Sequence, residues 1–259
     1  MSVRERKARE RRARREAILA AAAKVFAAHR LEGATVEMVA REAEVAVGTI
    51  YLYFCSRDDV FLSLMAERIG RLRARYLEIR ARGLAPADEV RAIGAAYLDY
   101  LRESRGLFLA QLAVDFGKLP LRLSRPEELE RYEQVRRLGR ECFNLWRDAV
   151  GRLLGGAGEA NAAATRAATV IWAALNGAFL LTGDEAIFRD VTGLEAAGLP
   201  EETFEFQLAA AEAAAASTRR NGMHPENGNR TANGHGGNGK GAARPSPRRR
   251  RKAAPAANG

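Results

Sequence analysis

Residues 35–60 read TVEMVAREAEVAVGTIYLYFCSRDDV, and this stretch decides how the N-terminal part of the chain folds. Apolar residues recur at helical spacing over 36–43 and again over 46–53, which predicts two short helices. Glu44 and Val45 interrupt the pattern, so a tight turn is expected between the helices. Two short helices joined by a few residues are typical of a helix-turn-helix unit.

The residues on either side of this stretch complete a three-helix head. Before it, apolar residues recur on one face of a longer helix over about 4–29, and Leu31-Glu32-Gly33-Ala34 is expected to break that helix. Thr35 stands where an N-cap is needed. Ser56-Arg57-Asp58-Asp59 fits a capping box, and it opens a long helix that is expected to reach Ala81.

The most characteristic part of the stretch is Val47-Gly48-Thr49-Ile50-Tyr51-Leu52-Tyr53-Phe54, followed by Ser56-Arg57-Asp58. With these residues, the segment 14–65 resembles the helix-turn-helix domain of the TetR family of transcriptional regulators. The resemblance implies an N-terminal DNA-binding domain and a helical-bundle body for ligand binding and dimerisation. It also implies that the following positions lie at or near DNA: Thr35, Val47, Gly48, Thr49, Tyr51, Tyr53 and Arg57.

The residue types at these positions suit contact with the DNA major groove, which is about 12 Å wide. Gly48 lets the backbone approach closely, and Thr49 can meet a base, a thymine methyl group or a phosphate. The tyrosine hydroxyls and the arginine can bind phosphates. Plainer interpretations stay open: Thr35 as a cap alone, the tyrosines as core residues, and Arg57 as a solvated charge. Glu37 either repels phosphate or selects cytosine.

Two positions depart from the family pattern. Glu44 stands where the turn between the two helices usually carries glycine, which predicts a strained or differently wound turn. Val47 stands where the recognition helix often begins with lysine. Residues 17–65 hold four Arg and Lys against six Asp and Glu, so the head itself is slightly acidic. Attraction to phosphate then depends on the basic residues of 4–15.

The rest of the chain predicts helices and no strands. Helical patterns are expected over 57–81, 87–103, 107–116, about 125–154, 159–182 and 184–192, and from Pro200 to about 216. Ser124 and Glu127 fit a capping signature before the fourth of these. Residues 221–259 have no hydrophobic run that could be buried, which is typical of disorder. The expected fold is all-α, with a flexible arm 1–16, a head 17–56, a body 57–216 and a disordered basic tail 217–259.

The TetR resemblance implies a ligand pocket in the body, and plain hydrophobic core is the alternative for each candidate lining residue. Asn176 differs from the others because it is an amide within the uncharged stretch 167–183, so it needs a partner if buried. The homodimer is expected to use the helices at 130–154 and 159–182. The lining candidates are Phe108, Leu112, Phe116, Phe143, Trp146, Trp172, Asn176 and Phe179.

The net charge of +10 is concentrated at the two ends of the chain. Residues 1–16 hold eight Arg and Lys against three Glu, and residues 217–259 hold ten against one. A mildly acidic body with two basic ends indicates a polyanionic partner, either nucleic acid or an anionic membrane. The tail is expected either to add non-specific phosphate affinity or simply to keep the protein in solution.

Enzymatic and metal-dependent functions find no support in the sequence. Two cysteines without a CxxC pair, and three histidines of which two lie in the tail, predict no metal site, no cofactor and no catalytic centre. Cys55 and Cys142 are expected to be ordinary thiols, with a redox switch at Cys55 as the alternative. The stretch 167–183 is at the lower length limit for a membrane span, and we interpret it as a buried helix. No targeting segment is recognised, so a cytoplasmic, nucleoid-associated protein is expected.

These features predict a ligand-responsive transcriptional regulator, most simply a repressor, that binds a palindromic operator on double-stranded DNA as a homodimer. A small, mostly apolar effector is expected to bind the body and release the DNA. The alternative is an architectural DNA-binding protein that acts through its basic ends without sequence preference.

Overall fold

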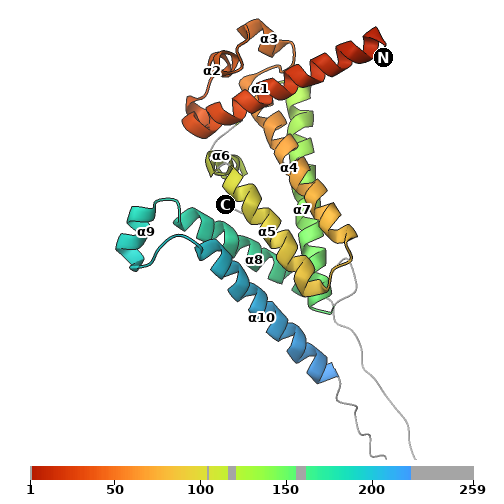
Figure 1. Ribbon diagram of the computed structural model, residues 1–259, viewed down its shortest axis with the longest axis vertical. Helices are drawn as coiled ribbons and strands as arrows, with labels where there is room; N and C mark the ends of the chain where they lie inside the picture. Colours follow the sequence, from red (N-terminus) through yellow and green to blue (C-terminus); the bar gives the residue numbers. More distant parts are fainter. Residues whose placement is uncertain (1, 104, 116–120, 156–161, 223–259) are drawn as a thin grey trace, which may run out of the picture. The chain divides into compact units, whose positions relative to one another are not determined.

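Figure 1 shows the computed structural model, which describes residues 2–103, 105–115, 121–155 and 162–222. All regular structure in these ranges is helical, which confirms the expected all-α class. The helices are, in chain order, α1 (Val3–Gly33), α2 (Val36–Glu42), α3 (Val47–Tyr51), α4 (Arg57–Ala81), α5 (Pro86–Glu103), α6 (Arg105–Asp115), α7 (Pro126–Leu153), α8 (Ala162–Leu181), α9 (Glu185–Thr192) and α10 (Leu199–Gly222).

The first three helices and the start of α4 enclose a small hydrophobic core, which makes the three-helix head. Its buried members include Ile18, Phe26, Ile50 and Phe61. The rings of Phe26 and Phe61 meet edge to face, with their centroids 5.4 Å apart. Helix α3 is too short to be stable alone, so the fully buried Ile50 is the anchor that fixes its orientation.

Helix α1 is continuous from Val3, which differs from the flexible arm that the sequence predicts for residues 1–16. The Ser2 hydroxyl accepts from the Glu5 N–H at 3.2 Å, and the Glu5 carboxylate accepts from the Ser2 N–H at 2.8 Å. Arg, Ala and Glu fill the first turns and are good helix formers. The helix also continues through the break expected at Leu31, because Leu31 is buried in the head core and holds the last turn in place.

The turn between α2 and α3 has the strain that the sequence predicts. Glu44 has a φ of 54°, in the left-handed region that favours glycine. The turn is closed by the Val45 N–H, which donates to the Ala40 carbonyl at 3.0 Å. The backbone can make this turn only if residue 44 adopts a positive φ, which is strained for glutamate.

Glu44→Gly is expected to raise the free energy of unfolding by about 1 kcal/mol, because glycine adopts this φ without a steric cost. Glu44→Ala keeps the Cβ and with it the strain, so it is the matched control. Urea unfolding of both variants at the same pH measures the difference. Equal stability of the two variants would show that the turn stores no strain.

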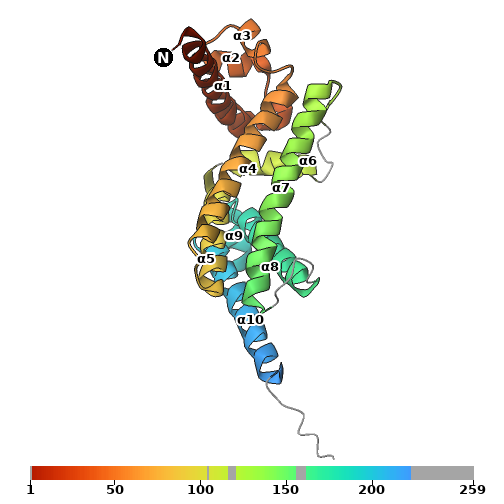
Figure 2. The same cartoon turned by 90° about the vertical axis from the view of Figure 1, so that its right-hand side faces the viewer.

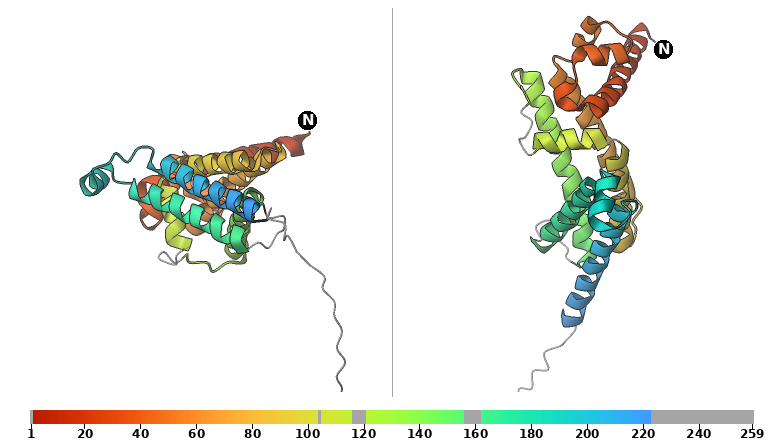
Figure 3. Two further views of the ribbon diagram at one scale, coloured as in Figure 1. Left: turned by 90° about the horizontal axis from the view of Figure 1, so that it is seen from below. Right: turned by 90° about the vertical axis from the view of Figure 1, so that its left-hand side faces the viewer.

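The body packs around a second core, in which α4 and α7 lie side by side (Figures 1 and 2). Helix α5 packs against both of them, and α8 packs against α7 and α10. Figure 3 shows α8 and α10 next to each other from two further directions. Arg152 of α7 and the buried Glu89 of α5 form a bidentate pair with N–O distances of 2.6 and 2.9 Å. This pair fixes α5 against the end of α7.

Helix α6 contributes to both cores. Leu107 and Ala110 are buried in the head core, whereas Phe108 is buried in the body core. The start of α6 lies against α1, because a Cβ at Gly106 would be only 2.6 Å from the Ala27 carbonyl oxygen. A side chain at Gly106 would therefore have to displace the backbone of α1.

Two helix boundaries differ from the sequence prediction. Helix α7 begins at Pro126, and Glu128 rather than Glu127 accepts from the N–H groups of Ser124 and Arg125, at 2.7 and 2.9 Å. Proline suits this first position because it has no N–H to leave unpaired. Helix α10 continues to Gly222, past the end expected near residue 216. The remainder of the predicted tail, 223–259, lies outside the described residues.

Helix α8 is long and apolar enough to cross a membrane, by length and composition. In the structure its face with Ala168, Ile171 and Leu175 is buried in the body core, where α8 packs against α7 and α10. One face of α8 is thus buried, as we interpret the stretch 167–183, whereas Val170 and Leu181 on the same helix are exposed.

Candidate DNA interface and ligand cavity

The outer side of α3 gathers the central residues of the predicted DNA interface. Tyr51 is 53% exposed, Gly48 is exposed, and Val47 and Thr49 are partly exposed. A Cβ at Gly48 would meet nothing within 4 Å. Ile50, in contrast, is buried in the head core. Helix α3 therefore packs on the head core through Ile50, and its opposite face, with Gly48 and Tyr51, is open to close approach by another molecule.

The predicted contacts that flank α3 have structural partners of their own. Thr35 is exposed, and its hydroxyl accepts from the Met38 N–H at 3.3 Å, so it caps α2. Tyr53 is half-buried, with the Arg11 guanidinium 5.6 Å from the centre of its ring. Hydrogen bonds from its own backbone N–H and from Thr35 lower the pKa of Glu37, so α2 carries an ionised carboxylate in its first turn. DNA contact stays a prediction for these residues.

Arg57 connects the start of α4 to the end of α1. Its guanidinium donates to the Leu31 carbonyl at 3.1 Å and to the Asp58 carboxylate at 2.7 and 2.9 Å. These bonds hold the side chain inside the head, where it is partly buried. The structure therefore gives Arg57 an internal role beside the phosphate contact that the sequence predicts.

Three buried carboxylates, Asp58, Asp59 and Glu128, join the start of α4 to the start of α7, and we call them the junction cluster. Asp58 accepts from the Arg122 N–H at 2.8 Å, and Asp59 accepts from the Cys55 N–H at 3.0 Å. The cluster therefore ties the segment before α7 to the residues that directly follow the recognition helix.

Glu128 has the most enclosed carboxylate of the junction cluster, with a residue exposure of only 1%. Burial opposes its ionisation, but hydrogen bonds from Ser56 and from the backbone N–H groups of Arg125 and Ser124 outweigh burial. The net effect is that the pKa of Glu128 lies below its ordinary value. A group whose folded pKa is lowered contributes stability above its unfolded pKa and loses that contribution as the pH falls through the folded value.

Glu128→Gln is expected to lower the free energy of unfolding at pH 7 by about 1.5–3 kcal/mol, the range for hydrogen bonds to a charged group. The deficit relative to the unsubstituted protein should shrink progressively as the pH falls below about 4, because the unfolded state is protonated first and the folded state follows at the lowered pKa of Glu128. The exposed neighbour Glu127, replaced by Gln, controls for loss of charge at the start of α7. Denaturant unfolding between pH 3 and pH 7 checks the prediction, and a deficit that is constant over that range contradicts it.

Both cysteines have the properties of ordinary thiols. Burial is the main cause that raises the pKa of Cys55 to about 11, and the Asp59 carboxylate adds to it. Burial also raises the pKa of Cys142 to about 12. Since the thiolate is the reactive form, neither group is activated at neutral pH. The geometry therefore gives no support to a redox switch at Cys55.

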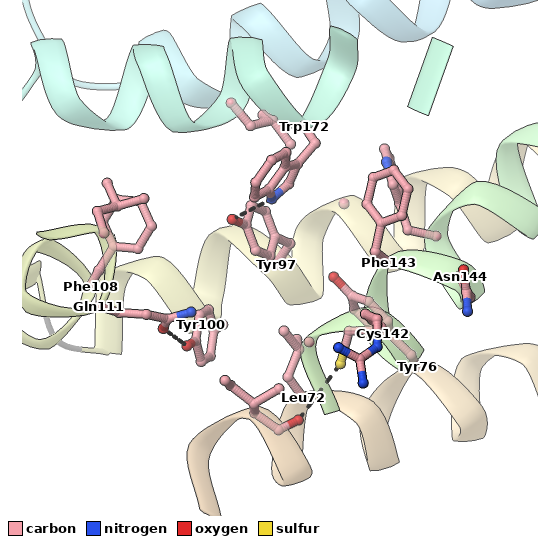
Figure 4. Close-up of a pocket in the computed structure, with 17 residues that line it drawn as sticks. Leu72, Tyr76, Tyr97, Tyr100, Phe108, Gln111, Cys142, Phe143, Asn144 and Trp172 are labelled. Carbon is pink, nitrogen blue, oxygen red and sulfur yellow. Dashed lines mark hydrogen bonds between the residues drawn. The ribbon is translucent and has the colours of Figure 1, made fainter. Parts of the chain in front are cut away.

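The body core contains a cavity of about 430 Å³, lined by residues of α4, α5, α6, α7 and α8 (Figure 4). Small-molecule sites typically have volumes of roughly 300–1,000 Å³. Five of the expected lining residues contribute to its wall: Phe108, Leu112, Phe143, Trp146 and Trp172. Phe179 packs on Phe108 with ring centroids 5.4 Å apart, behind the wall. Phe116 lies outside the described residues.

Hydrogen-bonded side chains stiffen two parts of the cavity wall (Figure 4). The Trp172 indole N–H donates to the Tyr97 hydroxyl, and that hydroxyl donates to the Asn176 side-chain oxygen, both at 2.8 Å. Asn176 thus finds the partner that its burial requires within the protein. The Tyr100 hydroxyl donates to the Gln111 side-chain oxygen at 2.7 Å and so links α5 to α6.

The charged residue that lines the cavity lies where the cavity meets solvent. Arg140 carries the only charge among the described lining residues, and it is exposed, as is the neighbouring Asn144. Burial raises the pKa of Tyr76 well above its ordinary value, so this phenol stays neutral. The arrangement combines an apolar interior with a positive, solvent-facing edge.

Sequence reasoning missed the cavity residues contributed by the first body helices: Ile69, Leu72, Tyr76, Tyr97, Tyr100 and Gln111. Most of them lie on the apolar stripes that predict α4 and α5. Periodicity identifies such residues as inward-facing, but it does not separate a filled core from a cavity wall. Only the arrangement of five helices around one space makes that distinction.

Comparisons with known proteins agree with this geometry. Residues 18–64 match the family described as bacterial regulatory proteins of the tetR family. The fatty acid metabolism regulator protein of Bacillus subtilis (strain 168) is 29% identical over 119 residues. That alignment covers 46% of this chain and 61% of the relative's length.

Solved structures share the fold at low sequence identity. The regulator FadR from Bacillus subtilis, in complex with stearoyl-CoA, gives a TM-score of 0.53 at 20% identity, with 75% of this chain and 97% of that chain covered. The fatty acid degradation regulator FadR from Bacillus halodurans gives 0.55 at 22% identity, covering 75% and 94%. A TetR-family regulator from Bordetella parapertussis 12822 gives 0.54 at 19% identity, covering 75% and 93%. The match to the tetR family thus covers the helix-turn-helix, and the solved structures show that the chain shares the fold of these regulators.

Proposed function

We propose that the protein is a repressor that binds a palindromic operator as a homodimer and is released by an effector with a long apolar chain and an anionic head, of the fatty acyl-CoA class. The observation that carries the proposal is the cavity of about 430 Å³, because α4 and α6 both line it and both enter the head core. A ligand there contacts the two helices that can move the DNA-binding head.

The chemistry of the cavity supports this effector class. An apolar interior suits an acyl chain, and Arg140 at the exposed edge suits an anionic head group. The relative from Bacillus subtilis is a fatty acid metabolism regulator, and the FadR structure from that organism holds stearoyl-CoA. Both facts concern those proteins, and they make stearoyl-CoA the first ligand to test with this one.

We propose that the effector acts by shifting the positions of α4 and α6. Helix α4 lines the cavity through Ile69, Leu72 and Tyr76 and begins directly after the recognition helix. Operator binding requires the two recognition helices of the dimer to sit about 34–36 Å apart, one turn of DNA. Tilting α4 changes this spacing, so an effector that prefers the tilted state lowers the affinity for DNA.

We place the dimer contact on α8 and α10. Of the two helices that the sequence suggests, α8 has an apolar residue, Val170, that is 56% exposed. On α10, which packs against α8, Phe206 is 74% exposed. Exposed large apolar side chains on neighbouring helices are typical of interaction surfaces.

The decisive experiment selects bound sequences from a random DNA pool and then titrates stearoyl-CoA into the operator complex. A palindromic operator, a dimer on DNA and release by the ligand support the proposal. Uniform footprints that disappear after deletion of residues 223–259 would instead support the architectural alternative. A repressor of this kind acts where the chromosome is, so we propose a cytoplasmic location.

A further inference from the structure

One face of α1 changes its chemistry along the helix. In an α-helix, successive residues are about 100° apart, because there are 3.6 residues per turn. Positions 4, 7, 11 and 14 therefore lie on the same side of α1 as Ile18, Ala22 and Val25, which are buried in the head core. This side is apolar where the head covers it and basic in the turns that precede the head.

The basic part of this face borders the recognition helix. Lys7, Arg11 and Arg14, which we call the basic stripe, line a surface groove of about 570 Å³ together with Glu10, Leu52 and Tyr53. Leu52 directly follows the last residue of α3. Figures 1 and 2 show the start of α1 at the same end of the head as α3. The groove therefore continues the exposed surface of the recognition helix.

Contacts with the residues that directly follow α3 hold this part of α1 in place. The Arg11 guanidinium lies 5.6 Å from the centre of the Tyr53 ring, and the Arg15 guanidinium lies 5.3 Å from the centre of the Phe54 ring. Both distances are within the range of cation–π contact. Since α1 is one helix from Val3, the charges of the stripe are fixed relative to the recognition helix.

The cations of the stripe are available to a partner. All three residues are exposed, and within the described ranges none of them forms an ion pair. Glu10, the acidic residue of the groove, pairs with Arg6 on its far side at 3.7 Å. The groove therefore presents unneutralised positive charge next to an uncharged recognition helix.

We propose that the basic stripe is a rigid clamp for the DNA phosphate backbone, and that it supplies the attraction that the slightly acidic head lacks. The proposal rests on DNA binding through α3, as proposed above. From Lys7 to Arg14 the helix rises about 10.5 Å, so the three cations form a row that can meet more than one phosphate of the DNA backbone. The position beside α3 favours DNA over an anionic membrane as the partner.

The test compares two triple variants of the full chain that lose the same charge. Lys7→Gln/Arg11→Gln/Arg14→Gln removes the stripe, and Arg6→Gln/Arg9→Gln/Arg12→Gln removes three cations from the other sides of the same helix. Glutamine keeps the helix propensity similar, and circular dichroism with thermal unfolding confirms that both variants fold. Affinity for the selected operator is measured as a function of salt concentration for both.

Each lost phosphate contact should reduce the slope of log affinity against log salt by about 0.9. We expect the stripe variant to lose about 2–3 units of slope per protomer and to bind at least about tenfold more weakly at 0.1 M salt. The control variant should change the slope by less than about one unit. Equal changes in both variants, or no change in the stripe variant, would overturn the clamp. Phosphate ethylation interference should identify phosphates whose modification weakens binding of the unsubstituted protein and of the control variant, and the stripe variant should lose this interference.

The outcomes for the clamp and for the proposed function can be told apart. If the selection yields no operator, the proposed function fails, and the salt slopes measured on a random duplex still decide whether the stripe binds phosphate. If an operator is found and the stripe variant retains its full salt slope, the clamp alone fails. If the clamp is correct, the stripe variant should select the same operator sequence as the unsubstituted protein, because phosphate contacts carry affinity and not sequence preference.

Discussion

Replacing Thr49 and Tyr51 together by alanine is expected to abolish retardation of the operator while the free energy of unfolding stays within about 1 kcal/mol of the unsubstituted protein. Both residues lie on the exposed side of α3, and the anchor of the helix, Ile50, is untouched. A specific contact to DNA contributes about 1–3 kcal/mol, and a homodimer loses each contact twice. The expected loss of affinity therefore exceeds about 100-fold, since about 1.4 kcal/mol corresponds to a factor of ten.

A matched control removes the same two residue types outside the recognition helix. Tyr132 on α7 and Thr192 on α9 serve for this purpose, replaced together by alanine. Gel retardation and fluorescence anisotropy with the selected operator measure binding, and thermal unfolding measures stability. Retained operator binding in the Thr49→Ala/Tyr51→Ala variant would mean that α3 is not the reading helix.

The second large effect is expected at Gly139, which lines the cavity from α7. A Cβ at this position would meet nothing within 4 Å, so a larger side chain extends into open space. Gly139→Phe is expected to occupy the site of the effector while leaving the head intact. Forcing a ligand into an overfilled site costs about 1–3 kcal/mol, which is roughly a 5- to 150-fold increase in the ligand concentration needed for release. The variant should bind the operator normally and respond poorly to stearoyl-CoA.

Gly139→Ala is the control for this substitution. It should raise the free energy of unfolding by about 0.5–1 kcal/mol, because alanine replaces glycine within a helix, and it should leave most of the cavity open. Titration of stearoyl-CoA into preformed operator complexes of both variants measures the response. Normal release from the Gly139→Phe variant would place the effector elsewhere in the protein.

The helix-turn-helix could be predicted from the sequence because its determinants are local. The spacing of apolar residues, the cap at Thr35 and the interruption at Glu44 each act over one or two turns. Even the strain at Glu44 could be anticipated, since glycine is the residue that such a turn prefers. Residues 1–16 have no apolar face to bury, which predicts a flexible arm, whereas the capping box of Ser2 and Glu5 starts a continuous helix there.

The ligand cavity was only half predictable. The TetR resemblance implies a pocket in the body, and Phe108, Leu112, Phe143, Trp146 and Trp172 of the eight candidate residues line the cavity. Tyr97 and Tyr100 form part of the cavity wall through hydrogen bonds to Trp172 and Gln111. Trp172 is distant in the sequence from Tyr97, and Gln111 lies on a different helix from Tyr100. No local pattern reports such a contact.

The sequence by itself determined an all-helical protein with a recognition helix of uncharged residues and with positive charge at its two ends. Only the tertiary structure decided where the N-terminal charge points, which helices enclose a cavity and which of them reach the head. The physical reason is range. Helix propensity, capping and amphipathic spacing act within a few residues, whereas a groove, a cavity or a buried junction exists only where distant segments pack together.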